Sequence, residues 1–392
     1  MIPESSRDCV RNPGPTLPIV HVGLGDGYND YPGRQLLLHA LSSYTPVIIL
    51  RWRDPGEGLL RGPYLREVRP GIFELRNAFS LRNSRLGRLG RGVGRLDGTL
   101  LRRALRSEGI GDFIYWLSVP EPRLLWGMPT HRLVYDCVDP CFIPERQGEF
   151  DRKEFAVAKK AKVVFCTARA LLRRLSRVSG NISLLPNACA KEYFGAGGNA
   201  DPRAARKLEG RKRPIIGYMG TLDWRFDVES VRCAAEALPD YSFALVGRLN
   251  KDQEERISPL AALPNVVMVG PVSREEGVAY NAAFDVGIIP FTPGPMNDAI
   301  NPVKMYMYLA AGKPVVSTHI EEASDNSDLV RVARSPEAFA ELIRAAVESD
   351  NCSARLQRRQ FGLSNTWDDR ALEAIRIMER EGWFNPKGDQ GC

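Results

Sequence analysis

Short apolar runs recur along most of the chain, and stretches in which apolar residues repeat at helix spacing lie between them. Runs of roughly 4–8 apolar residues bounded by turn residues are typical of buried strands, and longer periodic stretches are typical of helices. Their alternation predicts an α/β fold with parallel sheets. The predicted strands are 18–22, 47–50, 113–119, 132–138, 163–166, 182–185, one opening at Pro214, 243–247, 266–270, 286–290 and 314–317. The predicted helices include 34–41, 154–160, 168–178, 336–349 and 368–381.

The length of the chain, 392 residues, exceeds what one hydrophobic core normally organises. We therefore expect two domains, each of roughly 150–200 residues. Residues 196–213 are rich in Gly, Ala and charged residues and show no apolar period, which is typical of a linker. This places an N-terminal domain at 1–195 and a C-terminal domain at 214–366, each with a Rossmann-like alternation of strands and helices.

The stretch 285–318 combines a strand, a loop with prolines and a glycine, a helix and a second strand. Asn301 is a good N-cap and Pro302 a good first helical residue, so a helix should begin there with Lys304 in its first turn. Gly312 is expected to close this helix. Free N–H groups at a helix start, next to a cation and beyond the carboxyl end of a strand, predict an anion-binding site.

The sequence NPVKMYMYLAAGKPVVST within this stretch closely resembles the nucleotide-sugar-binding segment of the group 1 family of retaining glycosyltransferases, which have the GT-B fold. It follows the family pattern N-P-x-K-x-Y-E-Y-L-A-A-G-K-P-V-V except at Met307, where the family usually has a glutamate that hydrogen-bonds the donor ribose. The acid often found eight residues earlier is replaced by Ala299, with Asp298 one position away. A thioether cannot hold a ribose hydroxyl as a carboxylate does, so donor binding should rely on other groups or be weaker.

The resemblance implies two Rossmann-like domains facing each other across a cleft, with the C-terminal helix crossing back so that 367–392 joins the first domain. It also implies a donor site in the second domain, where Gly220 lets the backbone approach a ligand and Arg225 stands near a helix start. Arg225 and Lys304 are the expected catalytic cations, because they would neutralise a diphosphate leaving group. The donor-binding residues expected from the resemblance are Gly220, Val272, Asn297, Asp298, Asn301, Pro302, Val303 and Met307.

The N-terminal domain holds the candidates for the acceptor side. The turn GLGDGYND follows the first strand but lacks the full spacing of a dinucleotide fingerprint, and the resemblance places Gly25 and Asp26 on the acceptor side. Asp139 follows the strand 132–138 and could accept the proton of an incoming hydroxyl, with Asp136 as its substitute. The alternative, that these aspartates cap the following helix, stays open. His131 is expected to be a surface residue.

A formal net charge of +7 indicates an anionic partner. The segment 76–106 contains nine arginines and one acid, Asp97, among many leucines, and it follows an irregular connection predicted at 51–71. The segment is either a solvated loop and helix whose leucines pack on the domain, or a surface that contacts an anionic membrane. Nucleic acid is disfavoured as a partner, because Phe79 alone cannot form a stacking platform for bases.

No apolar run approaches 18 residues, and the N-terminal sequence lacks the features of a signal peptide. The eight cysteines are scattered, without a C-x-x-C pair, as expected for reduced thiols. We therefore expect a cytoplasmic protein, peripheral at the inner face of the membrane if 76–106 binds lipid.

Together these features predict a glycosyltransferase of the hexosyltransferase type that moves a sugar from a nucleoside-diphosphate sugar, with UDP favoured over GDP, to a hydroxyl acceptor. The acceptor is a glycan, a lipid-linked glycan or a small molecule, and retention is implied by the resemblance. No cofactor and no metal is expected, since the sequence offers no D-x-D acid pair. Two alternatives stay open: a GT-B epimerase or phosphorylase with the same pocket, and a catalytically degenerate partner subunit, suggested by Met307 and Ala299.

Overall fold

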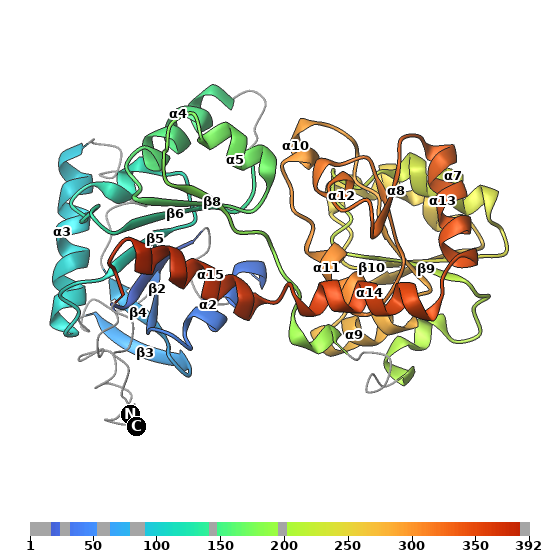
Figure 1. Ribbon diagram of the computed structural model, residues 1–392, viewed down its shortest axis with the longest axis horizontal. Coiled ribbons are helices and arrows are strands. Elements are labelled where there is room, and N and C mark those ends of the chain that lie inside the picture. The colour runs from blue at the N-terminus through green and yellow to red at the C-terminus, as the bar shows by residue number, and fades with distance from the viewer. Residues whose placement is uncertain are drawn as a thin grey trace. The chain divides into compact units, whose positions relative to one another are not determined.

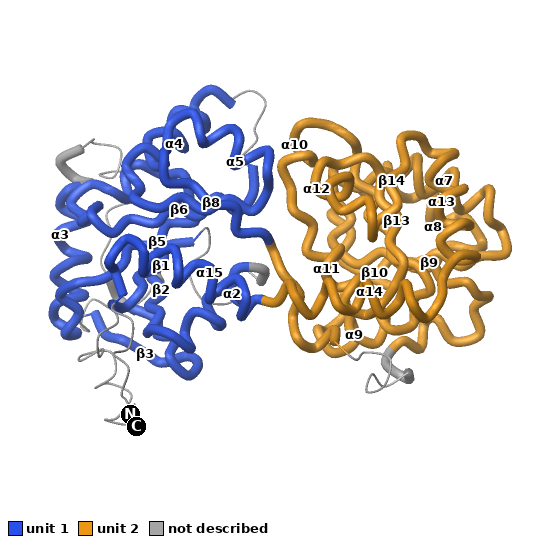
Figure 2. Tube along the Cα trace, in the orientation of Figure 1, with its two compact units in different colours: residues 1–186, 367–392 blue, residues 187–366 orange. Residues whose placement is uncertain are grey.

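The computed structural model describes residues 17–23, 32–52, 63–78, 91–140, 147–194 and 202–384. The chain divides into two compact units, coloured separately in Figure 2: unit 1 comprises Met1–Pro186 and Trp367–Cys392, and unit 2 comprises Asn187–Thr366. Each unit is built on one sheet with helices around it (Figure 1), which confirms the predicted α/β class. The C-terminal helix returns to unit 1, as the resemblance implied.

Unit 1 contains an eight-stranded sheet in the order β3-β4-β2-β1-β5-β6-β7-β8. Its neighbouring strands are parallel except β3 and β4, which form an antiparallel hairpin that turns at Gly71 with a φ of 72°. Four strands, β1, β5, β6 and β7, are buried at every residue, as is usual for parallel strands covered on both faces. The strands are β1 (Ile19–Val22), β2 (Val47–Trp52), β3 (Tyr64–Arg69), β4 (Ile72–Ala78), β5 (Ile114–Leu117), β6 (Leu133–Cys137), β7 (Val163–Cys166) and β8 (Ile182–Leu184).

The C-terminal helix of unit 1 is held by a stripe of apolar residues. Trp367, Ala371, Ala374, Ile375 and Met378 are buried at helix spacing, and the helix contacts α2. This amphipathic pattern explains why the end of the chain folds into the first unit. The helices of unit 1 are α2 (Pro32–Leu41), α3 (Arg91–Ser107), α4 (Gln147–Ala158), α5 (Arg169–Leu175) and α15 (Trp367–Arg380).

Helix α3 forms the described end of the basic segment. Leu101 and Leu105 are buried, whereas Arg103 and Arg106 are exposed. This end therefore has the character of a solvated helix whose leucines pack on the domain. Residues 79–90 lie outside the described part of the chain. None of the described helices is both long and apolar enough to cross a membrane.

Unit 2 contains a six-stranded parallel sheet in the order β11-β10-β9-β12-β13-β14. Counted from β9, this is the order 3-2-1-4-5-6 of a doubly wound sheet, whose direction of winding changes between β9 and β12. Ligands of such sheets bind beyond the carboxyl ends of the strands at that switch point. The strands are β9 (Ile215–Met219), β10 (Ser242–Val246), β11 (Val266–Gly270), β12 (Val286–Ile289), β13 (Val315–Thr318) and β14 (Val330–Ala333).

Helices pack closely on the sheet of unit 2. A Cβ at Gly217 would lie 2.1 Å from the ring of Phe284, and a Cβ at Gly287 would lie 2.4 Å from the ring of Tyr308. Glycine at these two strand positions therefore lets aromatic side chains lie directly on the backbone of the sheet. The helices of unit 2 are α7 (Val228–Ala237), α8 (Glu254–Ala261), α9 (Arg274–Ala283), α10 (Pro295–Asp298), α11 (Val303–Ala310), α12 (Glu321–Ser324), α13 (Pro336–Glu348) and α14 (Cys352–Leu363).

Two predictions from composition are corrected by the structure. The units change at residues 186–187, ahead of the predicted linker 196–213. The described part of that stretch includes a 3₁₀ helix, η6 (Pro202–Leu208), which contacts α9 and β11 and from which the Nζ of Lys207 donates to the carbonyl of Val269 at 2.6 Å. The stretch predicted to be irregular, 51–71, contains the strand β3, which has three charged residues among six and therefore no apolar run that would predict a strand.

Candidate functional site

The switch point of unit 2 lies where β9 and β12 end beside each other. Gly220 directly follows β9 with a φ of 153°, which L side chains rarely adopt. A Cβ there would lie 3.0 Å from Oη of Tyr218 and 3.1 Å from Nζ of Lys304. Gly247, after β10, packs so tightly that its Cβ would lie 2.0 Å from the carbonyl oxygen of Gly220. These glycines keep the space beside Lys304 free of side chains, which a ligand contacting the backbone requires.

Lys304 stands in the first turn of α11, as the sequence predicted. Its Nζ lies 4.2 Å from the ring centroid of Phe291 and 4.5 Å from that of Tyr218, and it donates to Oη of Tyr218 at 3.4 Å. Aromatic faces attract an ammonium group but replace only part of its hydration. Burial consequently lowers the pKa of Lys304, the charge of Arg225 adds to the shift and Asp223 opposes it, and together they bring the pKa to about 7.

Arg225 lies in the loop between β9 and α7, and Asp223 fixes its direction. The guanidinium nitrogens donate to both carboxylate oxygens of Asp223 at 2.5–3.1 Å, and the same carboxylate accepts the backbone N–H of Arg225. The Cζ of Arg225 lies 5.9 Å from the ring centroids of Trp224 and Phe291. Phe291 therefore contacts both cations, and the fold brings together Arg225 and Lys304.

The cluster carries more positive than negative charge. Among the described residues, Arg225 forms an ion pair with Asp223, and the charge of the same carboxylate acts on Lys304. An anion would offset both the desolvation of Lys304 and its repulsion by Arg225. A diphosphate suits the arrangement, because a guanidinium holds two oxygens at once and an ammonium acts as a point charge on a third. Among the residues that the structure describes, no group of three or more His, Cys, Asp or Glu side chains could hold a metal ion.

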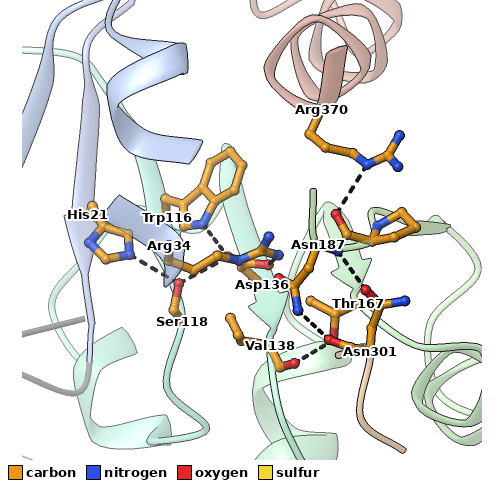
Figure 3. A network of polar contacts seen from close by, with 11 residues as sticks. His21, Arg34, Trp116, Ser118, Asp136, Val138, Thr167, Asn187, Asn301 and Arg370 are labelled. Carbon is orange, nitrogen blue, oxygen red and sulfur yellow. Dashed lines mark hydrogen bonds and ion pairs between the residues drawn. The ribbon is translucent and has the colours of Figure 1, made fainter. Parts of the chain in front are cut away.

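The prediction that Asn301 caps α11 is wrong. Its Oδ1 accepts the N–H of Asn187 at 3.1 Å (Figure 3), and its Nδ2 donates to Glu322 at 2.9 Å, so both ends of the amide are occupied. Pro302 takes the N-cap position and Val303 begins the helix. No side chain caps this helix start, so its first N–H groups still suit an anion.

Asn297 and Asp298 lie in the short helix α10. Asn297 is buried and its Nδ2 donates to the carbonyl of Thr292 at 2.6 Å, while its Oδ1 has no hydrogen-bond partner in the described chain. Oδ1 of Asp298 accepts the N–H of Glu321 at 3.1 Å. Asp298 therefore holds the start of α12, and Asn297 retains an unused acceptor.

Unit 1 has a polar network at its own switch point, between β1 and β5 (Figure 3). Asp136, on β6, accepts from Nε of Arg34 at 3.0 Å and forms a second, shorter bond with the same guanidinium. It also accepts from Oγ of Ser118 at 3.2 Å and from Nε1 of Trp116 at 3.3 Å. Nε2 of His21 lies 3.0 Å from Oγ of Ser118. Asp136, the substitute proton acceptor predicted from sequence, is thus enclosed and engaged with three donors.

His21 is the part of this network that the sequence gave no reason to single out. Burial lowers the pKa of His21 to about 4; the carboxylate of Asp136 opposes the shift and the charge of Arg34 adds to it. The ring is therefore neutral at neutral pH. Its Nδ1 has no hydrogen-bond partner among the described residues, and neither has Nη1 of Arg34, so these two nitrogens are open polar atoms of the network.

Asp139 and His131 are the other candidates of the first domain that the structure describes. Asp139 is exposed and follows β6 by two residues, and its role as a proton acceptor stays a prediction. Gly25 and Asp26 lie outside the described residues. His131 is exposed, with Nε2 3.7 Å from Oδ1 of Asp112, as expected for a surface position.

Comparisons with known proteins follow the same division of the chain. Residues 213–349, within unit 2, match the family model for Glycosyl transferases group 1. This segment is a group 1 glycosyltransferase domain. The chain is also 29% identical over 224 residues to TuaH of Bacillus subtilis (strain 168), whose name describes a glycosyltransferase of teichuronic acid biosynthesis. The match covers 53% of this chain and 56% of TuaH, so it spans about half of each protein.

Solved structures extend the likeness beyond the group 1 domain. Sucrose-phosphate synthase from Thermosynechococcus elongatus matches with a TM-score of 0.67 at 19% identity, covering 93% of this chain and 98% of that one. A structure from E. coli, described as trehalose-6-phosphate bound with UDP-2-fluoro glucose, matches with a TM-score of 0.68 at 13% identity over 93% and 99% of the two chains. At these identities the likeness shows the fold, which is GT-B, as predicted.

Within the group 1 domain, Met307 takes the place of the usual glutamate. It is half-buried in α11, and its carbonyl accepts from Nδ2 of Asn281 at 3.2 Å. Oδ1 of Asn281 has no hydrogen-bond partner among the described residues. The polar side chain that contacts the backbone of Met307 is therefore the amide of Asn281, which keeps an unused acceptor.

Val272, one of the donor-binding residues expected from the resemblance, lies in the turn between β11 and α9. A Cβ at Gly277, in the first turns of α9, would meet Cε of Met219 at 3.1 Å, Oη of Tyr193 at 3.8 Å and Cγ2 of Val272 at 4.0 Å. These side chains form a largely apolar surface around Gly277. Met219 also precedes Gly220, so this surface adjoins the cation cluster.

Three residues of the group 1 site were missed from the sequence: Tyr218, Asp223 and Phe291. Phe291 directly follows the β12 strand and its proline, and Asp223 precedes Arg225 by two residues. An acid that close to a predicted anion-binding arginine is a recognisable signal of a positioning pair. The contact of Tyr218 with Lys304 depends on strand order and has no local signal.

Proposed function

We propose that this protein is a retaining glycosyltransferase that takes a nucleoside-diphosphate sugar in unit 2 and passes the sugar to a hydroxyl acceptor bound by unit 1. The observation that carries the proposal is the cluster of Lys304, Arg225 and Gly220 at the switch point of the group 1 domain. It offers surplus positive charge where a diphosphate would lie.

The cluster suits the leaving group better than the sugar. Negative charge grows on the diphosphate as its bond to the sugar breaks. Fixed cations therefore bind the transition state more strongly than the ground state, and this lowers the barrier. Asp223 holds Arg225 in place before the reaction, and the aromatic rings of Tyr218 and Phe291 hold Lys304. We propose that these two cations and the uncapped start of α11 neutralise the diphosphate without a metal ion.

We propose UDP as the nucleotide in preference to GDP. The E. coli structure with the same fold is described with a UDP sugar, which supports this choice. For the acceptor we propose only a chemical class, a hydroxyl group on a glycan, a lipid-linked glycan or a small molecule. Asp139 remains the candidate that would take its proton, since Asp136 is enclosed by its three donors.

The proposal is tested by calorimetric titration of the full chain with UDP, GDP and ADP in the presence of EDTA. We expect micromolar binding of UDP, weaker binding of the other two, and loss of UDP binding in Lys304→Ala. The exposed Arg334, which follows the edge strand β14, provides a matched control through Arg334→Gln. If none of the nucleotides binds, the chain is a degenerate partner subunit, the alternative suggested by Met307 and Ala299.

Product analysis separates transfer from the other enzymatic alternatives. The protein is incubated with hydroxyl acceptors and with sugar conjugates of the nucleotide that binds. The products are followed by NMR of the anomeric proton. Transfer with retention gives a glycoside of unchanged anomeric configuration. An epimerised sugar, or a sugar phosphate formed with inorganic phosphate, would instead identify an epimerase or a phosphorylase.

We also propose that the basic segment 76–106 contacts an anionic membrane surface. The exposed arginines of α3 support this, although its buried leucines show that contact would be through charge rather than through those side chains. Sedimentation with anionic vesicles should then fall as salt rises, because exposed charges are screened beyond about 8–10 Å at physiological ionic strength. Equal sedimentation with neutral and anionic vesicles, or none, would contradict the proposal.

A further inference from the structure

Unit 2 has a polar pocket at the opposite end of the sheet from the proposed donor site. This pocket, of about 450 Å³, is lined at the amino ends of three strands by Pro214 before β9, Asp285 before β12 and Lys313 before β13. Gly220 follows the other end of β9, and the five residues of that strand, at ~3.3 Å each, separate the two places. The amino-end pocket is therefore distinct from the cation cluster.

Positive charge predominates in the amino-end pocket. Four cationic side chains line it, against the two carboxylates of Asp285 and Asp350. The carboxylates are already engaged: Asp285 accepts from Arg213 at 2.6 Å and from the N–H of Ile215 at 2.6 Å, and Asp350 accepts from Arg355 at 2.7 Å and from Arg358. The four cations are Arg213, Lys313, Arg355 and Arg359.

Helix ends explain part of this charge. Nζ of Lys313 donates to the carbonyl of Ala282 at 2.7 Å and Arg213 donates to that of Ala283 at 3.1 Å, both at the carboxyl end of α9. Cations at a helix carboxyl end satisfy its free carbonyls and complement its dipole. These bonds account for one donor of Lys313 and leave its other two unassigned.

Arg359 is not explained in this way. It projects from α14, which contacts α11, and its Nε lies 3.0 Å from the position that a Cβ on Gly312 would take. Arg359 is exposed, and among the residues that the structure describes it forms no hydrogen bond or ion pair. Gly312 has a φ of 76° at the end of α11, so the residue that closes this helix also leaves room for the guanidinium.

We propose that the amino-end pocket binds a phosphate group, held by Arg359 and Lys313 with Arg213 and Arg355 at its sides. A phosphate fits the guanidinium fork and the unassigned ammonium donors, and it balances charges that the two carboxylates leave in excess. Burial lowers the pKa of Lys313 to about 8; Asp285 opposes the shift, and the three arginines add to it, so an anion in the pocket relieves their repulsion.

The size of the pocket leaves room for more than a phosphate ion, since small-molecule sites span roughly 300–1,000 Å³. The phosphate has two possible sources. One is a small phosphorylated solute; the other is a lipid headgroup, for which the exposed Leu356 and Leu363 of α14, 66% and 60% exposed, would face the acyl boundary. The same cations would hold the phosphate in either case.

The test titrates inorganic phosphate and glycerol 3-phosphate calorimetrically into the full chain at constant ionic strength. Saturating UDP is present in these titrations so that phosphate cannot bind at the donor site. If UDP does not bind, the titrations use the double variant Lys304→Ala/Arg225→Ala, which lacks the cations of that site. The test therefore remains valid even if the proposed function fails. Arg359→Gln should weaken phosphate binding roughly tenfold, because it removes a charge-assisted contact. Arg334→Gln, an exposed arginine elsewhere in unit 2, should leave phosphate affinity unchanged, and UDP affinity should be the same in both variants.

A second arm identifies the source. Vesicles of neutral lipid with and without phosphatidic acid are sedimented with the wild type and both variants. If only the vesicles bind, and Arg359→Gln reduces that binding while Arg334→Gln does not, the phosphate is that of a lipid headgroup. If neither solute nor vesicle binds, or if Arg359→Gln behaves as Arg334→Gln does, the pocket is not a phosphate site.

Discussion

Both units gather charged side chains at the switch point of a parallel sheet, but they balance charge in different ways. In unit 1, the carboxylate of Asp136 receives the guanidinium of Arg34 and two further donors, and both charged side chains are at most 2% exposed. In unit 2, Arg225 and Lys304 share one carboxylate. In the first arrangement a guanidinium of the protein balances the carboxylate, although Nη1 of Arg34 and Nδ1 of His21 have no hydrogen-bond partner among the described residues. The second has excess charge that a ligand can neutralise.

This difference indicates which polar cluster acts on a ligand and which one supports the fold. A buried ion pair whose opposite charges already balance has less to gain from an incoming charged group than an unbalanced cation has. A cation whose pKa is lowered by burial and by a like charge gains when an anion arrives. We therefore assign Asp136 a positioning role and Lys304 a binding role, and the following predictions test that division.

The largest effect is expected on stability, from Asp136→Asn. The change keeps the shape of the side chain but leaves Arg34 as a buried charge without its partner, which typically costs about 3–5 kcal/mol. Urea unfolding followed by circular dichroism should show this loss in the free energy of unfolding. The exposed neighbour provides the control, since Asp139→Asn should shift stability by no more than about 0.5 kcal/mol. If Asp136→Asn and the wild type unfold at the same urea concentration, the charge of Asp136 is not needed for stability.

The next effect is expected on turnover, from Lys304→Ala and Arg225→Ala. Each should lower kcat/KM by roughly 10², because each removes a charge-assisted contact that is strongest as the diphosphate leaves. The melting temperature should stay within a few degrees, since Lys304 is stabilised mainly when an anion is bound and Arg225 is partly exposed. Initial rates and thermal melts on the same preparations check both parts, with Arg334→Gln as the control. Unchanged rates would remove the residue from the site.

The buried parts of the fold could be predicted from sequence because parallel strands covered on both faces appear as short apolar runs. The strands β7 and β11 have the predicted bounds. The edge strand β3 was missed because three of the six residues of its sequence, YLREVR, are charged and none is buried, although the Pro-Gly pair after it is a turn signal. The helix α14 was missed because the residues it buries are Arg358 and Gly362 rather than an apolar stripe.

The candidate site could be predicted only where the signal is local. The sequence placed Lys304 in a first helical turn and Gly312 at the helix end, where the N–H of Lys313 bonds the carbonyl of Tyr308. It failed at Asn301, because partners distant in sequence, Asn187 and Glu322, outweigh the local preference for capping. The rings around Lys304 depend on the order of strands in the sheet, which neighbouring residues do not encode.

A smaller effect, on donor affinity, is expected from Met307→Glu. If the ribose lies where the family binds it, the new carboxylate accepts hydrogen bonds worth roughly 1.5–3 kcal/mol, and UDP should bind about tenfold more tightly. Met307→Gln is the matched control, because it has nearly the same shape without the charge and should give a smaller gain. Weaker UDP binding together with a large fall in melting temperature would mean that the half-buried carboxylate has no partner and that the ribose lies elsewhere.

The smallest effect is the pH dependence that Lys304 should give to UDP binding. Burial lowers its pKa from 10.5 to about 7 in the free protein, so near pH 7 the side chain is about half protonated. A diphosphate prefers the protonated form and raises the pKa again, so binding takes up a proton above pH 7. Affinity should be highest below pH 7 and should fall about fivefold between pH 7 and 8.

The free protein should show the opposite trend in stability. Because the unfolded chain keeps the proton on Lys304 up to about pH 10.5 and the folded chain loses it near pH 7, unfolding binds a proton in this window, and this group makes the folded state more stable as pH rises. Calorimetry in two buffers of different ionisation enthalpy measures the proton uptake on UDP binding, and Lys304→Arg, which stays charged throughout, should abolish it. If proton uptake persists in Lys304→Arg, another group takes up the proton. The charge of Lys304 would then not be the feature that distinguishes unit 2 from unit 1.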